Sequence, residues 1–315
     1  MKIVILDKGT LGEDIDLSPL RALGETAEYE KTSPEDVAAR IADADVLVIN
    51  KIKLGEANLP FAKKLRLICV SATGYDNIDT VYCRAHGIAL CNVPGYSTES
   101  VAQLTLAMAL SLATNLTQYR SFTHSGAYTE SGKANSVSPV FHEISSMTWG
   151  VVGGGGIGAR VAGIASALGC RVLMCRRKKE ELYEQATIDE ICKEADIISL
   201  HVPLSDETRG MISRERIAEM KNGAILINVA RGAVCDEEAL AEAIENGKLG
   251  GLGVDVYSCE PFGKDHPFSR ILSRENVCLT PHMAWGAQES RNRCVREIGK
   301  NISAFLGGEA RNRIV

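Results

Sequence analysis

The chain has 315 residues, of which 45% are hydrophobic and 24% are charged, and its formal net charge is −5. This length exceeds that of most single-core domains, so we expect one large domain or two medium ones. The modest negative charge argues against a nucleic-acid partner, and no apolar run approaches the roughly 20 residues of a transmembrane helix. We therefore expect a cytoplasmic protein that binds neither nucleic acid nor a membrane.

Short runs rich in β-branched residues alternate along the chain with longer helical patterns. The first run ends at Asp7 and is too short for the apolar region of a signal peptide, so it is typical of a buried strand. Further runs lie at 46–49, 67–70, 151–152, 172–174, 197–200, 225–227, 252–254 and 277–280. Nearly continuous apolar strands separated by helices indicate parallel sheets covered on both faces. The sequence therefore predicts a doubly wound α/β fold.

A long apolar helical pattern runs from Thr98 to Leu116. The stretch 119–148 that follows is polar and weakly periodic, and this break separates two sets of strands and helices. Because a structureless loop of this length is uncommon inside a compact domain, we expect an arm that packs on another subunit. Two later helices have readable starts, with Ser213 before the helix at 214–221 and Asp236 before the helix at 237–246.

Ten cysteines are scattered along the chain without a C-x-x-C pair. A chain of this length needs no disulfide framework, and no zinc-ligand spacing is present, so we expect reduced, buried thiols and no metal site. If one thiol is reactive, Cys259 beside Glu260 is the candidate.

A glycine-rich turn follows the apolar run at 151–152. Gly153, Gly155 and Gly158 satisfy the pattern G-x-G-x-x-G between a strand and a helix, which is the context that a dinucleotide-binding turn requires. The first glycine permits the turn, the second lets the backbone approach a pyrophosphate, and the third lets helix and strand pack closely. Gly156 and Ile157 would complete the cofactor contacts at the start of the helix. The alternative is a purely structural turn.

Basic residues follow the next strand, at the position where an acidic residue usually accepts hydrogen bonds from the ribose of NAD. The run is Arg176-Arg177-Lys178-Lys179. Guanidinium groups bind a 2′-phosphate through charge-assisted hydrogen bonds, whereas an acid would repel it. We therefore expect NADP in preference to NAD, with Arg176 and Arg177 as its ligands. A solvated basic loop is the alternative.

Arg231, Glu260 and His282 each follow a predicted strand in the second half of the chain. Ligands of doubly wound sheets bind beyond the carboxyl ends of the strands, so these side chains can converge on one site. Arg231 can bind a substrate carboxylate and polarise a neighbouring carbonyl. His282 can act as a general acid or base, and Glu260 can orient it and stabilise its positive charge. These roles suit hydride transfer between a nicotinamide and a small 2-oxo or 2-hydroxy acid.

Three segments together resemble the D-isomer-specific 2-hydroxyacid dehydrogenases: Asn228-Val229-Ala230-Arg231-Gly232, Asp255-Val256-Tyr257-Ser258-Cys259-Glu260-Pro261 and Thr280-Pro281-His282. The resemblance covers nearly the whole chain. It implies a flavodoxin-like substrate domain of residues 1–95 plus 286–315 and a Rossmann cofactor domain of residues 96–285. It also implies a homodimer, with 119–148 as the dimer arm.

The resemblance assigns further residues to the site. The segment 70–79 resembles the family's substrate loop, which implies that Ala72, Thr73 and Gly74 hold the substrate carboxylate through backbone N–H groups. The cofactor contacts that it implies, beyond the glycine turn, are Thr98, Val202, Pro203, Val229, Ala230, Asp255 and His282. Trp285 could form a wall of the substrate pocket or be an ordinary packing aromatic.

Within this family, the segment 281–287 and the end of the chain are most similar to bacterial glycerate dehydrogenases, also called hydroxypyruvate reductases. Glyoxylate is a further candidate substrate. Glu260 argues against a formate dehydrogenase and Thr73 against a phosphite dehydrogenase. Two alternatives stay open: a broad 2-oxo acid reductase, and a nicotinamide-sensing protein that resembles the corepressors of this fold. The chain departs from the family at Arg176, where an acid is usual, and at Ser146-Met147.

Overall fold

The computed structural model describes residues 1–177 and 182–315, so Lys178 and Lys179 of the basic run lie outside the described residues. The chain divides into two compact units, one of Met1–Ser97 with Trp285–Val315 and the other of Thr98–Ala284. The predicted boundaries were after residues 95 and 285. Tyr96, Ser97 and Trp285 therefore belong to the first unit and not to the cofactor unit.

The first unit contains a parallel sheet whose strand order is β2-β1-β3-β4-β5, which is the flavodoxin-like order. Its strands are β1 (Lys2–Ile5), β2 (Glu25–Glu28), β3 (Val46–Ile49), β4 (Leu67–Val70) and β5 (Ala89–Cys91). Its helices are α1 (Ser18–Arg21), α2 (Val37–Ile41), α3 (Thr80–Ala85) and α11 (Gln288–Leu306). Apolar clusters cover both faces of the sheet, one including residues of α1 and α11 and the other residues of α2 and α3.

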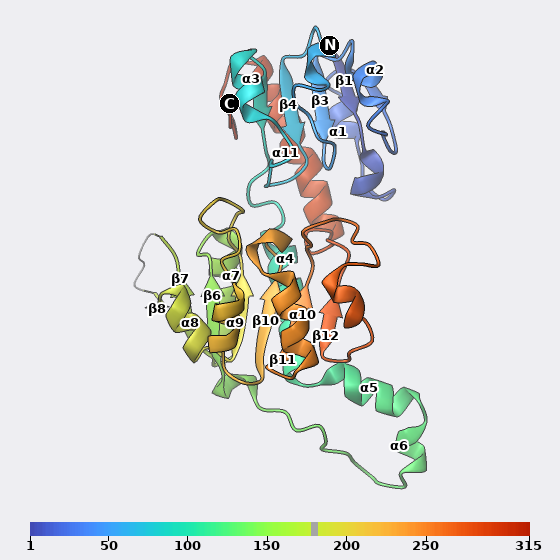
Figure 1. The fold of residues 1–315 in the computed structure, drawn as a ribbon. Coiled ribbons are helices and arrows are strands. Elements are labelled where there is room, and N and C mark those ends of the chain that lie inside the picture. The colour runs from blue at the N-terminus through green and yellow to red at the C-terminus, as the bar shows by residue number, and fades with distance from the viewer. Residues whose placement is uncertain (178–181) are drawn as a thin grey trace. The chain divides into compact units, whose positions relative to one another are not determined.

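The second unit contains a parallel sheet of order β12-β11-β10-β9-β6-β7-β8 (Figure 1). Its strands are β6 (Thr148–Val152), β7 (Arg171–Cys175), β8 (Glu184–Gln185), β9 (Ile197–Leu200), β10 (Ala224–Asn228), β11 (Leu249–Val254) and β12 (Val277–Leu279). Counted from β6, this is the Rossmann order with one additional strand. The prediction of two doubly wound parallel sheets is thus confirmed.

Helices cover both faces of the second sheet. They are α4 (Thr98–Ala113) and α7 (Gly156–Ala167) on one face, and α8 (Ile188–Glu194), α9 (Arg214–Glu219) and α10 (Glu237–Glu245) on the other. The predicted helix starts are confirmed, because the side chains of Ser213 and Asp236 accept hydrogen bonds from the N–H groups of Arg216 and Ala239.

Short 3-10 helices occur in both units. They are η1 (Lys8–Leu11), η2 (Leu59–Phe61), η3 (Ile144–Ser146), η4 (Gly232–Val234) and η5 (Pro267–Arg270).

The segment after α4 is not the structureless stretch that its composition suggested. The long helix ends at Ala113, and Asn115 takes a left-handed conformation with φ 52° before α5 (Leu116–His124) and α6 (Ala127–Glu130) (Figure 1). Neither of these two helices has a buried residue. Among the described residues no single helix is long and apolar enough to span a membrane; α4 and α5 meet that test only as a pair bent by 65°.

All ten cysteines are free thiols. Most are buried in the two sheets and their covering helices, and burial raises the pKa of the Cys294 thiol to about 12. Cys259 is exposed.

Candidate active site

The glycine-rich turn connects β6 to α7, and each of its three pattern glycines has a physical reason. Gly153 has a φ of +104°, and a Cβ built there would lie 2.6 Å from the carbonyl oxygen of His201. A Cβ at Gly158 would collide with the carbonyl oxygen of Gly153. A Cβ at Gly155 would meet no described atom within 4 Å. The first and third glycines are therefore required by the turn and its packing, whereas the second leaves the backbone open to a ligand.

The open side of this turn suits a dinucleotide. α7 begins at Gly156, so the unpaired N–H groups of its first turn and its positive dipole end lie beside Gly155. The hydroxyl of Thr98, at the start of α4, is 3.5 Å from the position of a Cβ on Gly156. The residues present thus fit a pyrophosphate at this turn.

Arg176 lies against the glycine turn. A Cβ built on Gly154 would lie 2.8 Å from both Cβ and Cδ of Arg176 and 2.9 Å from its Nε. Arg177 instead points to Glu207, with Nη2 and Oε2 3.5 Å apart and both side chains largely exposed. The two arginines therefore differ: Arg176 borders the candidate phosphate site, and Arg177 forms a solvent-exposed ion pair.

The remaining cofactor candidates lie at the carboxyl ends of the strands beside the turn. Val202, two residues after β9, has Cγ1 3.0 Å from the position of a Cβ on Gly153. The carbonyl of Pro203 accepts the Thr208 hydroxyl at 2.6 Å. After β10, Val229 packs against the apolar cluster beneath α4 and α7, and Ala230 is buried with its N–H bound to Asn228 Oδ1 at 3.0 Å.

Glu260 and His282 are brought together. Oε2 of Glu260 lies 2.6 Å from Nδ1 of His282, and its other oxygen accepts the N–H of Tyr257 at 3.0 Å. Because an ionised carboxylate can only accept, Nδ1 of His282 carries a hydrogen, and proton exchange with a substrate falls to Nε2. The carboxylate thus sets both the tautomer and the orientation of the ring.

The backbone of His282 has an unusual conformation that Asp255 supports. His282 has a φ of 53°, in the left-handed region that few residues other than glycine adopt. The Asp255 carboxylate accepts Thr280 Oγ1 at 2.6 Å and the N–H groups of Met283 at 2.8 Å and Ala284 at 2.9 Å. Burial raises the pKa of Asp255, and these hydrogen bonds oppose that shift. Asp255 thereby holds the turn that presents His282.

Arg231 follows β10 and lies where the chain enters η4. Its own carbonyl accepts the Asn228 side chain at 2.9 Å, and its Nη1 donates to the carbonyl of Ala230 at 2.8 Å. Arg231 as a residue is half-buried. A positively charged, planar donor group of this kind can bind a carboxylate through two hydrogen bonds.

The predicted substrate loop lies in the first unit, after β4. The hydroxyl of Thr73 donates to the carbonyl of Val93 at 2.9 Å, and the Asn92 amide donates to the carbonyl of Thr73 at 2.7 Å. The carbonyl of Ala72 accepts the N–H of Val93 at 2.9 Å. Within the described part of the chain, the N–H groups of Thr73 and Gly74 have no acceptor. Trp285 is also in this unit, where its ring packs 6.4 Å from that of Tyr96.

Glu260 lies in the loop that follows β11. Four residues in or around this loop were not identified as candidate site residues from the sequence. Glu237 and His266 lie behind the loop, Tyr257 lies within it, and Gly232 contacts its backbone. An acidic residue in the first turn of a helix ordinarily indicates only a favourable interaction with the helix dipole, so Glu237 gave no functional signal. The glycine directly after Arg231 was the one available indication.

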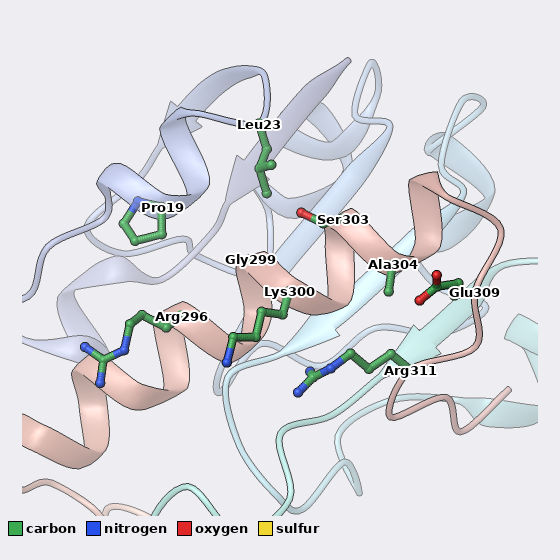
Figure 2. A pocket seen from close by; sticks show the side chains of 9 residues that line it. All are labelled: Pro19, Leu23, Arg296, Gly299, Lys300, Ser303, Ala304, Glu309 and Arg311. Carbon is green, nitrogen blue, oxygen red and sulfur yellow. The ribbon is translucent and has the colours of Figure 1, made fainter.

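One hollow of about 680 Å³ lies on the first unit (Figure 2). It is lined by Pro19, Leu23, Arg296, Gly299, Lys300, Ser303, Ala304, Glu309 and Arg311. None of these residues belongs to the predicted site. Lys300 and Arg311 both pair with Glu297, so much of the positive charge is neutralised locally. The described residues contain no cluster of three or more metal-binding side chains.

The chain is similar to known proteins in both sequence and structure. Residues 106–284 match the model of the D-isomer specific 2-hydroxyacid dehydrogenase NAD binding domain. The chain is 34% identical to a hydroxypyruvate reductase of Blautia hydrogenotrophica, over 99% of each chain. It is 32% identical to a glycerate dehydrogenase of Methylorubrum extorquens, over 99% of this chain and 98% of that protein.

A similar solved structure is the D-lactate dehydrogenase of Aquifex aeolicus, determined with NAD and lactic acid. Its TM-score is 0.87 at 32% identity, and the match covers 98% of this chain and 96% of that one. The family match at residues 106–284 spans the segment that contains the glycine turn, Glu260 and His282. The chain therefore belongs to the D-isomer-specific 2-hydroxyacid dehydrogenases, enzymes with a nicotinamide cofactor.

Proposed function

We propose that this enzyme reduces hydroxypyruvate to glycerate, and runs the reverse oxidation, with NADP(H) in preference to NAD(H). The observation that carries the catalytic assignment is the 2.6 Å contact between His282 Nδ1 and Glu260 Oε2. This contact orients a proton donor, and reduction of a ketone requires one proton at the oxygen for each hydride at the carbon.

In this proposal Arg231 binds the substrate carboxylate and polarises the adjacent carbonyl. His282 donates the proton from Nε2 to the carbonyl oxygen as negative charge develops there, and it takes the proton back in the oxidation. Glu260 stabilises the imidazolium and keeps the ring in place. The cofactor, when bound, supplies or accepts the hydride. The N–H groups of Thr73 and Gly74 are proposed as further donors to the carboxylate.

The glycine turn, the first turn of α7 and Thr98 are proposed to hold the pyrophosphate. The preference for NADP is supported by Arg176, whose side chain lies along Gly154 of the turn. A guanidinium there can bind a 2′-phosphate, and the two residues described directly after β7 are both arginines, with no acid among them to repel it. Arg177 is proposed as a weaker ligand, since it must leave Glu207 to reach a phosphate. Val202, Pro203, Val229, Ala230 and Asp255 are proposed to line the rest of the cofactor site.

Hydroxypyruvate is proposed because the relatives named above include a hydroxypyruvate reductase and a glycerate dehydrogenase. The test is a set of initial rates with hydroxypyruvate, glyoxylate, pyruvate and 2-oxoglutarate, each with NADPH and with NADH. We expect the highest kcat/KM for hydroxypyruvate with NADPH. A higher value for another acid would replace the substrate, comparable values for several acids would indicate a broad 2-oxo acid reductase, and a higher value with NADH would replace the cofactor.

We also propose a homodimer formed through residues 119–148. Its support is the exposed apolar surface on this arm, where Val137 is 78% exposed, Val140 73% and Phe141 49%. The arm has a defined internal structure, because the Tyr119 hydroxyl donates to the carbonyl of Pro139 at 2.6 Å and the rings of Tyr119 and Phe141 meet edge to face. Exposed apolar side chains on an ordered extension are typical of a protein interface.

A further inference from the structure

A buried carboxylate lies behind the loop that carries Glu260. Glu237 is the first residue of α10, and its side chain is only 9% exposed. Its Oε1 accepts the N–H of Ser258 at 2.9 Å, and its Oε2 accepts both the Ser258 hydroxyl and Nε2 of His266, the latter at 3.1 Å. Three donors thus converge on one carboxylate, two of them from the residue that lies two positions before Glu260.

The hydrogen-bond direction at His266 can be deduced. The backbone N–H of Phe268 points to Nδ1 of His266 at 3.2 Å. A backbone amide can only donate, so Nδ1 carries the lone pair and Nε2 carries the hydrogen. That hydrogen is directed at Glu237. The imidazole is 7% exposed and packs against the rings of Phe262 and Phe268, at centroid distances of 4.8 and 5.0 Å.

The loop that Glu237 holds is connected to both members of the catalytic pair. The N–H of Tyr257 donates to Glu260 Oε1 at 3.0 Å. The hydroxyl of Tyr257 donates at 2.8 Å to the carbonyl of Thr280, two residues before His282. A displacement of Tyr257 and Ser258 would therefore move both the Glu260 carboxylate and the backbone turn that carries His282.

The opposite side of the loop is also fixed. A Cβ on Gly232 would collide with the backbone of Tyr257 and Ser258, so the loop lies directly against this glycine. Gly232 follows Arg231. The loop is thus held between two segments. On one side is the segment of Arg231, the residue proposed to bind the substrate carboxylate, and on the other is the buried side chain of Glu237.

We propose that Glu237 and His266 are positioning residues for the reaction, which act by holding the Tyr257–Ser258 segment at the place where Glu260 meets His282. The proposal rests on the catalytic roles proposed above for Glu260 and His282. Its physical basis is the short distance of 2.6 Å between Glu260 Oε2 and His282 Nδ1. A displacement of about 1 Å in a catalytic group can lower the rate about 100-fold.

The substitution Glu237→Gln tests the proposal with little change of volume. The new amide can keep one acceptor oxygen, but its NH₂ group would face at least one of the three donors, and the tautomer of His266 prevents that ring from accepting. The loop must then shift or leave a donor unpaired. Glu238→Gln is the matched control, because Glu238 is the next residue of α10 and forms an exposed ion pair with Arg270.

We would measure kcat and KM for the preferred 2-oxo acid, the Kd of the nicotinamide cofactor from its fluorescence, and the thermal midpoint. For Glu237→Gln we expect kcat to fall by about tenfold or more, with a cofactor Kd within about twofold of the parent value. Glu238→Gln should change neither. His266→Gln, whose amide can still donate to Glu237, should keep more activity than the apolar His266→Leu. If Glu237→Gln does not fold, Ser258→Ala removes a single donor and should still lower kcat.

A double-mutant cycle separates positioning from a general effect on folding. In a Glu260→Gln background, Glu237→Gln should have little further effect on kcat, because the group that it positions is already gone. The positioning role alone would be overturned if Glu237→Gln lowered kcat by the same factor in both backgrounds. It would also be overturned if Glu237→Gln left kcat unchanged while Glu260→Gln lowered it. Full activity of Glu260→Gln would overturn the proposed catalytic role and the positioning role with it.

Discussion

The backbone of His282 adopts a left-handed conformation because the Asp255 carboxylate binds the N–H groups of the two residues that follow. The same turn places Nδ1 of His282 against Glu260, so a strained residue and a short hydrogen bond occur at one position. Strain of this kind persists only where neighbouring contacts enforce it, and it is concentrated at functional sites. This argues that His282 is held for chemistry and not merely for packing.

Replacement of His282 by asparagine should abolish turnover and spare cofactor binding. Asparagine also tolerates left-handed φ values, so the turn is retained while the proton donor is lost. We expect kcat to fall by about 100-fold to 10,000-fold. Steady-state rates and a fluorescence titration with the reduced cofactor would measure the two effects. His86→Asn, at an exposed histidine stacked on Tyr82, is the control. A His282→Asn variant with near-normal turnover would refute the assignment.

Replacement of Arg176 by aspartate should reverse the cofactor preference. The change removes a cation beside the glycine turn and introduces a charge that repels a 2′-phosphate but accepts the ribose hydroxyls of NADH. The ratio of kcat/KM with NADPH to that with NADH should fall by about tenfold or more. Arg177→Asp, which breaks the exposed pair with Glu207, should change the ratio less. An unchanged ratio for Arg176→Asp would instead indicate that the basic run is a solvated loop without a role in cofactor choice.

The central strands could be predicted from the sequence because they are buried on both faces. β3, β4 and β9 are buried along their whole length, and their nearly continuous apolar residues located them in the sequence. β2, β5 and β8 were missed. β2 and β8 are edge strands with polar residues such as Glu25 and Glu184, and β5 is an edge strand of only three residues. An edge strand is stabilised by pairing with its one neighbour, and its own composition carries little signal.

The site shows the same division. The glycine turn could be predicted because backbone conformation and close packing demand glycine at 153 and 158. Arg231, Glu260 and His282 could be named because each follows a strand. Glu237 and His266 could not, since their significance lies in contacts between segments far apart in the chain. Tertiary hydrogen bonds of this type leave no periodic pattern.

Replacement of Asn92 by alanine should weaken substrate binding. The Asn92 amide holds the carbonyl of Thr73, and its loss would loosen the loop that is proposed to bind the substrate carboxylate. We expect KM for the 2-oxo acid to rise by about fivefold or more, while the cofactor Kd is unchanged. Asn58→Ala, which removes a similar hydrogen bond to the carbonyl of Lys53 in the same unit, is the control. An equal rise of KM in both variants would contradict a specific role of the loop.

Charged substitutions on the arm should separate the proposed dimer. Val137→Asp combined with Val140→Asp places two charges on surface that the dimer would bury. Light scattering during size exclusion should then give a mass near the 33.9 kDa of one chain, against about twice that for the parent protein. Val81→Asp, on an equally exposed valine of α3, should leave the mass unchanged. A parent protein of 33.9 kDa would refute the dimer.

The His201 imidazole predicts a loss of stability in mild acid. Nε2 lies 3.0 Å from Ser199 Oγ, and Nδ1 is enclosed without a hydrogen-bond partner among the described residues, although His201 as a whole is only half-buried. Burial lowers its pKa to about 3 from an ordinary value of 6.5. The unfolded chain therefore binds a proton here as pH falls below about 6.5, whereas the folded chain does not until near pH 3. Stability is complete above that window and falls as pH decreases through it.

At pH 5 this linkage should lower the free energy of unfolding by about 2 kcal/mol relative to pH 7.5, since each pH unit below 6.5 costs about 1.4 kcal/mol. Urea unfolding at the two pH values measures the loss. His201→Gln lacks the titrating ring, so its loss between pH 7.5 and pH 5 should be smaller than that of the parent by about this amount. His86→Gln, at an exposed ring, should behave as the parent does. An equal loss in the parent and in His201→Gln would show that the ring at 201 is protonated in the folded chain as readily as in the unfolded one.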